Sequence, residues 1–220
     1  MVRLICLLIG YGCGLFQTSY IYGKTQGIDI REQGSGNAGT TNALRTLGVK
    51  AGVITFIGDC LKCIVAVLIV KMIFGNSHAD CLKLLGLYAA AGTILGHNFP
   101  FYMNFKGGKG IAATAGLLIS FDLRLTLVAL ILFLMAFFLT HYVSLGSLLV
   151  YAVFLSGTII FGQFKAWGME QHYLNEMYLL ATSLTLLAVY RHKDNIKRLL
   201  KGEENKTYLS SKNRARTTEE

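Results

Sequence analysis

Long apolar runs recur along this chain between short polar stretches, and they constrain its fold more than any other feature. A run of about 20 apolar residues can cross about 30 Å of hydrocarbon as an α-helix. The runs are continuous rather than alternating, which favours helices over the strands of a membrane barrel. Hydrophobic residues make up 53% of the 220 residues, charged residues make up 15%, and there is one proline. We therefore expect an all-α polytopic membrane protein that folds as one helical bundle.

The apolar runs number seven when the shortest is counted as a crossing. They cover residues 4–22, 53–74, 82–99, 111–121, 125–140, 143–164 and 173–190. Seven crossings, with the N-terminus outside and the C-terminus in the cytoplasm, place most of the 21 Lys and Arg residues inside, as the positive-inside rule requires. Arg3 alone weighs slightly against an outside N-terminus. A five-crossing arrangement, in which residues 111–140 form one bent span, keeps the same loops inside and stays the alternative.

The seven-crossing arrangement divides the chain into two parts. Residues 1–192 would form the transmembrane bundle with cytoplasmic active-site loops, and residues 193–220 would form a basic cytoplasmic tail. Leaving residues 111–121 out of the count gives six crossings, which would put the loop of residues 23–51 and the tail on opposite sides of the membrane. From Thr207 onward we expect disorder.

The first polar stretch, residues 34–45, has the composition of a phosphate-binding loop. Three glycines within six residues allow positive φ and close approach to a ligand. Small polar side chains add hydrogen-bonding groups, and an arginine adds a fork-shaped cation. A solvated turn has a similar composition, so this stretch alone does not decide the function. Its candidate ligands are Ser35, Gly36, Asn37, Thr41, Asn42 and Arg45.

The second polar stretch, residues 97–110, ends in Lys106-Gly107-Gly108-Lys109-Gly110 directly before an apolar run. A glycine turn that leads into a helix offers free N–H groups and a positive dipole end to an anion, and the lysines add charge. The stretch is not a Walker loop, because glycine follows Lys109 where Ser or Thr is required and the upstream glycine spacing fails.

The third polar stretch, residues 190–204, follows the last apolar run. His192 and Asn195 are three residues apart and would share one helical face near the interface. The surrounding Lys and Arg residues could hold lipid phosphates. A basic stop-transfer segment explains those cations equally well, but it gives no reason for His192 or Asn195.

Two further patterns lie inside the second apolar run. Asp59 and Lys62 are three residues apart, so they can pair on one helical face. Such a pair is either functional or a lock for helix packing. Cys60 and Cys63 form a C-x-x-C with no second pair or neighbouring His, so we expect buried small apolar residues and no metal site.

Taken together, the three polar stretches resemble those of the bacterial acyl-phosphate:glycerol-3-phosphate acyltransferase family, the PlsY type. The resemblance covers about residues 10–204 in the right order. One departure is Ala38, where the family usually has proline, and it leaves the rigidity of that loop open. The matching segments are Gly27-Ile28-Asp29-Ile30-Arg31-Glu32, Gly34-Ser35-Gly36-Asn37, Thr41-Asn42-Ala43-Leu44-Arg45, Gly96-His97-Asn98-Phe99-Pro100, Lys106-Gly107-Gly108-Lys109-Gly110, Tyr142-Val143-Ser144-Leu145-Gly146-Ser147, Arg191-His192, Asn195-Ile196 and Arg198-Leu199.

The resemblance implies a reaction and its partners. The 1-hydroxyl of glycerol 3-phosphate would attack acyl phosphate to give lysophosphatidic acid and phosphate, with no cofactor, nucleotide or metal. The expected partners are these two substrates, membrane lipid and a soluble enzyme that forms acyl phosphate, and no nucleic acid is expected. The implied location is the bacterial inner membrane, with the active site on the cytoplasmic side.

The resemblance also implies roles for single residues. Ser35, His192 and Asn195 would be catalytic, with His192 as general base or phosphate anchor. A substrate phosphate could equally serve as the base. The implied phosphate-binding residues are Gly36, Asn37, Thr41, Asn42, Arg45, Lys106, Gly107, Gly108, Lys109 and Ser144.

Other functions remain open at this point. An organic-phosphate transporter would also need a cationic pocket, although no inverted repeat is visible. A membrane scaffold would need only the basic tail. Among acyltransferases, those that use acyl thioesters carry a His and an Asp separated by four residues, and none of the five histidines has an Asp at that offset.

Overall fold

The computed structural model describes residues 1–208, and within this range the chain is helical and contains no strand. This confirms the expected all-α class. The helices are α1 (Val2–Gly14), α2 (Thr18–Thr25), η1 (Ile30–Glu32), α3 (Thr40–Leu47), α4 (Val49–Phe74), η2 (Ala79–Cys81), α5 (Leu82–Asn98), η3 (Phe101–Met103), α6 (Ile111–Phe121), α7 (Leu123–Thr140), α8 (Val143–Gln163), α9 (Gln171–Arg191) and α10 (Lys193–Lys201).

Four segments of the described chain are long and apolar enough to cross a membrane. They are Val2–Thr25, Val49–Phe74, Leu123–Thr140 and Val143–Gln163, and Ile111–Phe121 is a shorter apolar helix. The first of them joins α1 and α2, which are separated by a short break. The total of seven crossings therefore stays a prediction.

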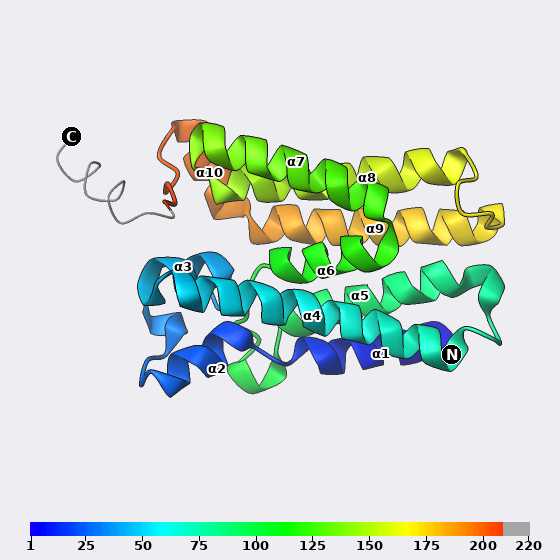
Figure 1. The fold of residues 1–220 in the computed structure, drawn as a ribbon, viewed down its shortest axis with the longest axis horizontal. Coiled ribbons are helices and arrows are strands. Elements are labelled where there is room, and N and C mark those ends of the chain that lie inside the picture. Colours follow the sequence, from blue (N-terminus) through cyan, green and yellow to red (C-terminus); the bar gives the residue numbers. More distant parts are fainter. Residues whose placement is uncertain (209–220) are drawn as a thin grey trace.

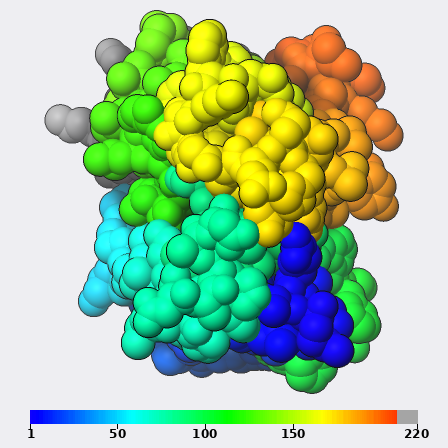
Figure 2. Space-filling model, turned by 90° about the vertical axis from the view of Figure 1, so that its right-hand side faces the viewer, coloured from blue at the N-terminus to red at the C-terminus, as the bar shows by residue number. Residues whose placement is uncertain are grey.

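The long helices lie side by side in two groups (Figure 1). Helices α1, α4 and α5 form one group, α7, α8 and α9 form the other, and α6 lies between them. The three polar stretches all lie at the end of the bundle that carries α2, α3 and α10, whereas the N-terminus lies at the opposite end. Figure 2 looks onto that opposite end, where the connections between α4 and α5 and between α8 and α9 lie in separate halves of the molecule.

Glycines let α1 and α5 approach more closely than any other residue would allow. A Cβ at Gly10 would lie 1.9 Å from the carbonyl oxygen of Ala89, and a Cβ at Gly92 would lie 2.0 Å from that of Leu7. Contacts this close are typical of helix pairs in membranes, where small residues permit backbone packing. The backbones of α1 and α5 are consequently in direct contact along the helix that leads into the glycine-rich loop.

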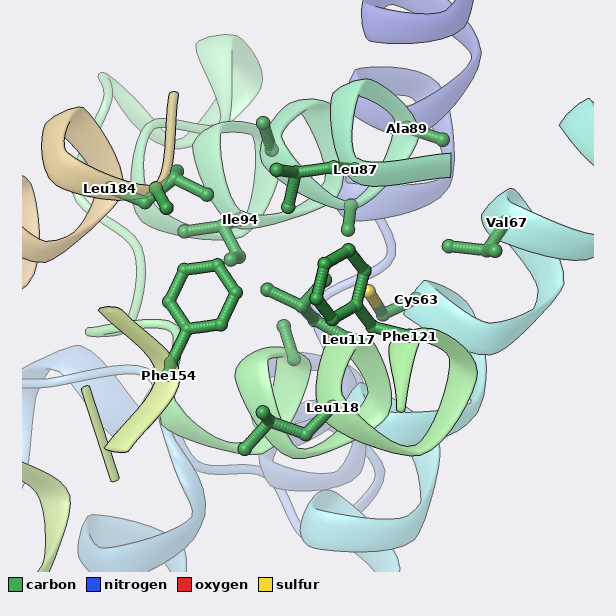
Figure 3. Packing of buried hydrophobic residues seen from close by; sticks show 14 of the residues in the cluster. Cys63, Val67, Leu87, Ala89, Ile94, Leu117, Leu118, Phe121, Phe154 and Leu184 are labelled. Atoms are coloured by element: carbon green, nitrogen blue, oxygen red, sulfur yellow. The ribbon is translucent and has the colours of Figure 1, made fainter. Parts of the chain in front are cut away.

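The apolar core joins the two groups of helices. Ile94 of α5, Leu117 of α6 and Phe154 of α8 are fully or almost fully buried and pack together there (Figure 3). Cys63 faces the same cluster and is a free, buried thiol, as is Cys60. The prediction that these cysteines act as small buried residues is confirmed.

Candidate active site

The segment Lys106–Gly110, called here the glycine loop, is held in place through its own backbone. The Gly108 amide donates to the carbonyl of His97 at 3.1 Å, and the Gly107 amide donates to that of Asn98 at 3.1 Å. Gly110 has φ of +85° and immediately precedes α6, a conformation that glycine adopts at little cost. Because both glycine amides are engaged, an anion at this loop would meet the lysine side chains and the first N–H groups of α6.

The third polar stretch closes over the glycine loop. The Arg191 guanidinium donates to the carbonyl oxygen of Gly108 at 2.8 Å and to that of Gly107 at 3.3 Å. The Lys109 ammonium donates to the side-chain oxygen of Asn195. The structure therefore brings the second and third polar stretches into direct contact.

A buried carboxylate balances part of this positive charge. Glu204 is 7% exposed and accepts from the Asn195 amide at 2.9 Å and from the Arg198 guanidinium at 3.0 Å. Burial, the largest cause, and the nearby Arg198 lower the pKa of Lys109 to about 8, while Glu204 opposes the shift. Lys109 is thus a cation at neutral pH that loses its charge more readily than an exposed lysine.

His192 is buried and held in one orientation. Its side chain lies at the junction of α9 and α10, it is 3% exposed, and its Nδ1 lies 2.8 Å from the carbonyl oxygen of Ala188. A carbonyl only accepts, so Nδ1 carries the proton and Nε2 keeps a lone pair. Burial lowers the pKa of His192 to about 4, and Lys109 contributes to the decrease. The imidazole is therefore neutral at physiological pH and can accept a proton at Nε2.

Asn42 shapes the first polar stretch from within. Its side-chain oxygen accepts from the Ser35 amide at 2.9 Å, and its side-chain nitrogen donates to the carbonyls of Ile30 and Gln33 at 3.0 and 2.9 Å. Gly34, with φ of +57°, lies against that side chain. Asn42 is 2% exposed, and its side chain holds the backbone of this loop through these hydrogen bonds.

The other predicted residues of this stretch are more accessible. Ser35 and Gly36 are exposed, and Asn37 and Thr41 are half-buried. The first and second stretches touch at Gly108, where a Cβ would lie 2.8 Å from the carbonyl oxygen of Ala38. The three polar stretches of the sequence consequently meet at one end of the bundle.

Arg45 binds the chain segment that follows α10. Its guanidinium donates to the Thr207 hydroxyl at 2.5 and 3.1 Å and to the carbonyl of Asn205 at 2.8 Å. A cavity of about 100 Å³ lies between Leu44, Arg45 and residues 206–208.

The Thr207 amide donates to the carbonyl of His141 at 2.9 Å. The expected disorder from Thr207 onward is wrong for Thr207, which is 2% exposed because these contacts fix it, and residues 209–220 lie outside the described chain.

Ser144 and Lys106 differ in their surroundings. Ser144 is 6% exposed in the first turn of α8, and within residues 1–208 its hydroxyl has no hydrogen-bond partner. Lys106 is exposed. A buried hydroxyl without a partner is uncommon in folded proteins, so Ser144 has a hydrogen bond to offer a ligand.

The structure adds Arg191, Arg198, Glu204 and Thr207 to the predicted site residues. Arg191 and Arg198 lie in segments that carry the family resemblance, but their spacing in the sequence does not indicate which groups they contact. Glu204 is an acid within a basic stretch, but its contact with Asn195, nine residues earlier, depends on the turn that follows α10. Within residues 1–208, no group of three or more His, Cys, Asp or Glu side chains is placed to hold a metal ion.

A larger cavity of about 270 Å³ lies away from these residues. It is lined by α4, α5 and the last residues of α6, including Lys71 and Lys83. Lys71 and Lys83 donate to the carbonyls of Ser120 and Phe121, at 3.2 and 2.5 Å, and so cap the C-terminal end of α6. The cavity contains none of the predicted site residues.

Known proteins resemble the chain over nearly its whole length. The family model for glycerol-3-phosphate acyltransferase matches residues 4–202. A glycerol-3-phosphate acyltransferase from Thermoanaerobacter sp. (strain X514) is 39% identical over 207 residues, which are 94% of this chain and 96% of that protein. The enzyme of the same name from Bacillus subtilis (strain 168) is 37% identical over 212 residues, 94% of this chain and 98% of that one.

Solved structures agree with these matches. The chain is similar to crystal structures of PlsY (YgiH), an integral membrane glycerol 3-phosphate acyltransferase, in its glycerol 3-phosphate form and its lysophosphatidic acid form. Both are 30% identical, with TM-scores of 0.78 and 0.76. The alignments cover 94% and 95% of this chain and 96% and 97% of the crystallised chains. These matches favour an acyltransferase and give no support to the organic-phosphate transporter.

Proposed function

The chain belongs to the glycerol-3-phosphate acyltransferase family, and from this membership and the geometry of the site we propose that it transfers a fatty acyl group from acyl phosphate to the 1-hydroxyl of glycerol 3-phosphate. The products are lysophosphatidic acid and inorganic phosphate. Acyl phosphate is an activated mixed anhydride, so the transfer requires no nucleotide. A soluble enzyme that forms acyl phosphate would then supply one of the two substrates.

The observation that carries this proposal is the convergence of cations from distant parts of the chain. Lys109 meets Asn195, and Arg191 binds the carbonyl of Gly108. Two phosphate-bearing substrates repel each other, and a cluster of partly buried cations offsets that repulsion. Glu204 is the buried acid at this cluster, and it is already engaged with Asn195 and Arg198.

Arg45 and Lys109 bind phosphate in this proposal. In the structure the Arg45 guanidinium holds a hydroxyl and a carbonyl oxygen of the following segment, Thr207 and Asn205. A substrate phosphate presents the same kind of acceptor with more negative charge, so it would replace these oxygens. Ser35 and Ser144 supply additional hydroxyl groups, of which that of Ser144 is buried without a partner among the described residues.

His192 accepts the proton in the proposed reaction. The oxygen of the 1-hydroxyl attacks the acyl carbonyl carbon, the bond from that carbon to the phosphate oxygen breaks, and phosphate leaves. The hydroxyl proton passes to Nε2 of His192, whose Nδ1 is anchored to Ala188. Asn195 positions Lys109 beside it. The alternative base, a substrate phosphate, would make the reaction independent of the His192 imidazole.

Seven crossings fit the proposed chemistry. The polar stretches lie at one end of the bundle (Figure 1), and the positive-inside rule assigns that basic end to the cytoplasm. We propose that residues 1–192 form the membrane bundle, that residues 193–220 form the basic cytoplasmic tail, and that the enzyme lies in the bacterial inner membrane. Its substrate glycerol 3-phosphate would then arrive from the cytoplasm.

A stoichiometry measurement tests the reaction. The purified protein, given acyl phosphate and glycerol 3-phosphate in detergent, should release one phosphate for each lysophosphatidic acid formed. Treatment with a metal chelator should leave the rate unchanged. Phosphate release without lysophosphatidic acid, or a rate abolished by the chelator and restored by a divalent cation, would contradict the proposal.

A further inference from the structure

A buried charged cluster lies directly beneath the glycine loop, and the proposed reaction does not use it. The Lys62 ammonium donates to Asp59 Oδ1 at 2.8 Å, to the carbonyl of Phe16 at 2.7 Å, and contacts His97 Nδ1 at 2.8 Å. Asp59 also accepts from the Thr18 hydroxyl at 3.0 Å. The predicted pairing of Asp59 with Lys62 within α4 is confirmed, and His97 extends the pair to a second helix, α5.

The contacts of Lys62 determine the state of His97. An ammonium group only donates, so Nδ1 of His97 accepts and the ring proton lies on Nε2. The side chains of Asp59, Lys62 and His97 are 1%, 5% and 3% exposed. The Nδ1 edge of the imidazole is therefore held by the Lys62 ammonium, which is itself buried and fixed by Asp59 and the carbonyl of Phe16.

The opposite edge of the His97 ring bears on the glycine loop. A Cβ at Gly108 would lie 2.0 Å from His97 Nε2, so the loop backbone rests against the ring with no room for a side chain. The His97 carbonyl also accepts the Gly108 amide at 3.1 Å and the Gln17 amide at 3.1 Å. On its other side, Gly108 is held by the Arg191 guanidinium.

We propose that the cluster of Asp59, Lys62 and His97 is a positioning device that fixes the glycine loop, and through it Lys109, at the place where the phosphate of glycerol 3-phosphate binds. This inference rests on the proposed function, because it takes Lys109 as a phosphate ligand. Lys109 follows Gly108 directly, so a shift of the loop moves its ammonium relative to Asn195.

Helix packing alone is a poor reason to keep these charges. Replacing a buried ion pair by apolar residues of similar volume is often neutral or stabilising, because desolvation offsets the attraction. A positional role gives the cluster a reason to be polar, since Lys62 orients the ring through a directed hydrogen bond. Apolar side chains of similar size would fill the space without fixing the ring.

The test uses His97→Asn in the full-length protein. The asparagine side-chain oxygen can replace Nδ1 as an acceptor for Lys62, but the shorter side chain leaves the space beneath Gly108 empty. We expect the dissociation constant of glycerol 3-phosphate, measured by calorimetry on purified protein, to rise about 10- to 100-fold, as the loss of one charge-assisted hydrogen bond to the phosphate would cause. The double variant Asp59→Asn/Lys62→Met should show a similar rise. The KM for glycerol 3-phosphate should increase more than kcat decreases.

A matched control is Glu176→Gln at the opposite end of the bundle. Glu176 accepts from Arg3 at 2.5 and 2.8 Å and from Tyr88 at 2.8 Å, so it joins three helices without touching the glycine loop. This variant should lower the melting temperature and leave the dissociation constant unchanged. If both cluster variants bind glycerol 3-phosphate like the wild type, or if both fail to fold while Glu176→Gln folds, the cluster is only structural and the proposal is wrong.

Lys109→Met separates this inference from the function on which it rests. Weaker binding in Lys109→Met together with normal binding in His97→Asn would contradict the positioning role alone. Normal binding in Lys109→Met would instead contradict the phosphate-binding role of Lys109 in the proposed function.

Discussion

Lys109 and Asn195 are separated by 86 residues, and the Lys109 ammonium donates to the Asn195 side-chain oxygen. Lys109 lies two residues before the start of α6, and Asn195 lies in the first turn of α10. Their contact joins a loop between two helices of the bundle to the segment that leaves it. The electrostatics of the proposed site depend on this junction, because Asn195 also binds the buried carboxylate of Glu204.

The partial burial of Lys109 predicts a dependence on pH. Its pKa is lowered to about 8, mainly by burial, so the free enzyme loses this charge as the pH rises above 8. Because kcat/KM reports the ionisation of free enzyme, kcat/KM for glycerol 3-phosphate should fall through this range. Steady-state kinetics between pH 6 and pH 10, roughly two units on either side of that pKa, measure the effect.

Lys109→Arg is the control for this effect. A guanidinium stays charged throughout the range, so the alkaline decrease should disappear even if the overall rate is lower. An unchanged alkaline decrease in Lys109→Arg would assign it to another group.

Arg45→Lys tests whether the guanidinium geometry matters in the first polar stretch. Lysine keeps the charge but loses the planar fork, so at least one charge-assisted hydrogen bond to phosphate is lost, and kcat/KM should fall about 10- to 100-fold. The variant should remain monodisperse in detergent, since Arg45 is only half-buried and its described contacts are with residues 205 and 207. A kcat/KM close to that of the wild type would remove Arg45 from the site.

Gly108→Ala tests the close approach of the glycine loop to α5. The new methyl group would lie 2.0 Å from His97 Nε2, so either the ring or the loop must move, and we expect loss of activity together with a lower melting temperature. Gly12→Ala is the matched control, because a Cβ there would meet nothing within 4 Å. Gly12 lies within α1, where alanine has the higher helix propensity, so this control should retain full activity. Full activity of Gly108→Ala would show that the loop tolerates displacement.

Single cysteines test the topology. Lys106→Cys and Lys201→Cys lie on exposed positions at the basic end, and we expect a membrane-impermeant thiol reagent to label both only from the cytoplasmic side. Lys165→Cys, between α8 and α9, is also exposed and should label only from the outside. The native cysteines are buried or half-buried and give a low background. Labelling of Lys106 and Lys201 positions from opposite sides would contradict the seven-crossing arrangement.

Local sequence patterns predicted much of the fold. The continuous apolar runs predicted the helical class, and the spacing of Asp59 and Lys62 predicted their ion pair at 2.8 Å. Both predictions depend on interactions within one helix or on solvation, and residue type and spacing determine these. The sequence does not determine the number of crossings equally well. Helix α6 is only 11 residues long, and among the described residues only four segments are long and apolar enough to cross a membrane.

The site was harder to predict where it depends on contacts between distant segments. The sequence indicates Lys109 and Asn195 separately, but their hydrogen bond depends on how α10, which packs against α8 and α9, lies next to the glycine loop. The hydrogen bond between Asn195 and Glu204 likewise depends on the turn of the chain after α10. The prediction of disorder at Thr207 is wrong because Arg45 and the carbonyl of His141, both distant in the sequence, hold this residue in place.

The choice of acyl donor is the central claim, and one comparison tests it most directly. Purified protein is given glycerol 3-phosphate with acyl phosphate, with acyl-CoA or with acyl-carrier protein, all carrying the same acyl chain, and lysophosphatidic acid is measured. The described loops are short and form no separate soluble domain that would bind a bulky nucleotide or a carrier protein. We expect product from acyl phosphate and little or none from either thioester. A comparable yield of lysophosphatidic acid from acyl-CoA under the same conditions would contradict the account.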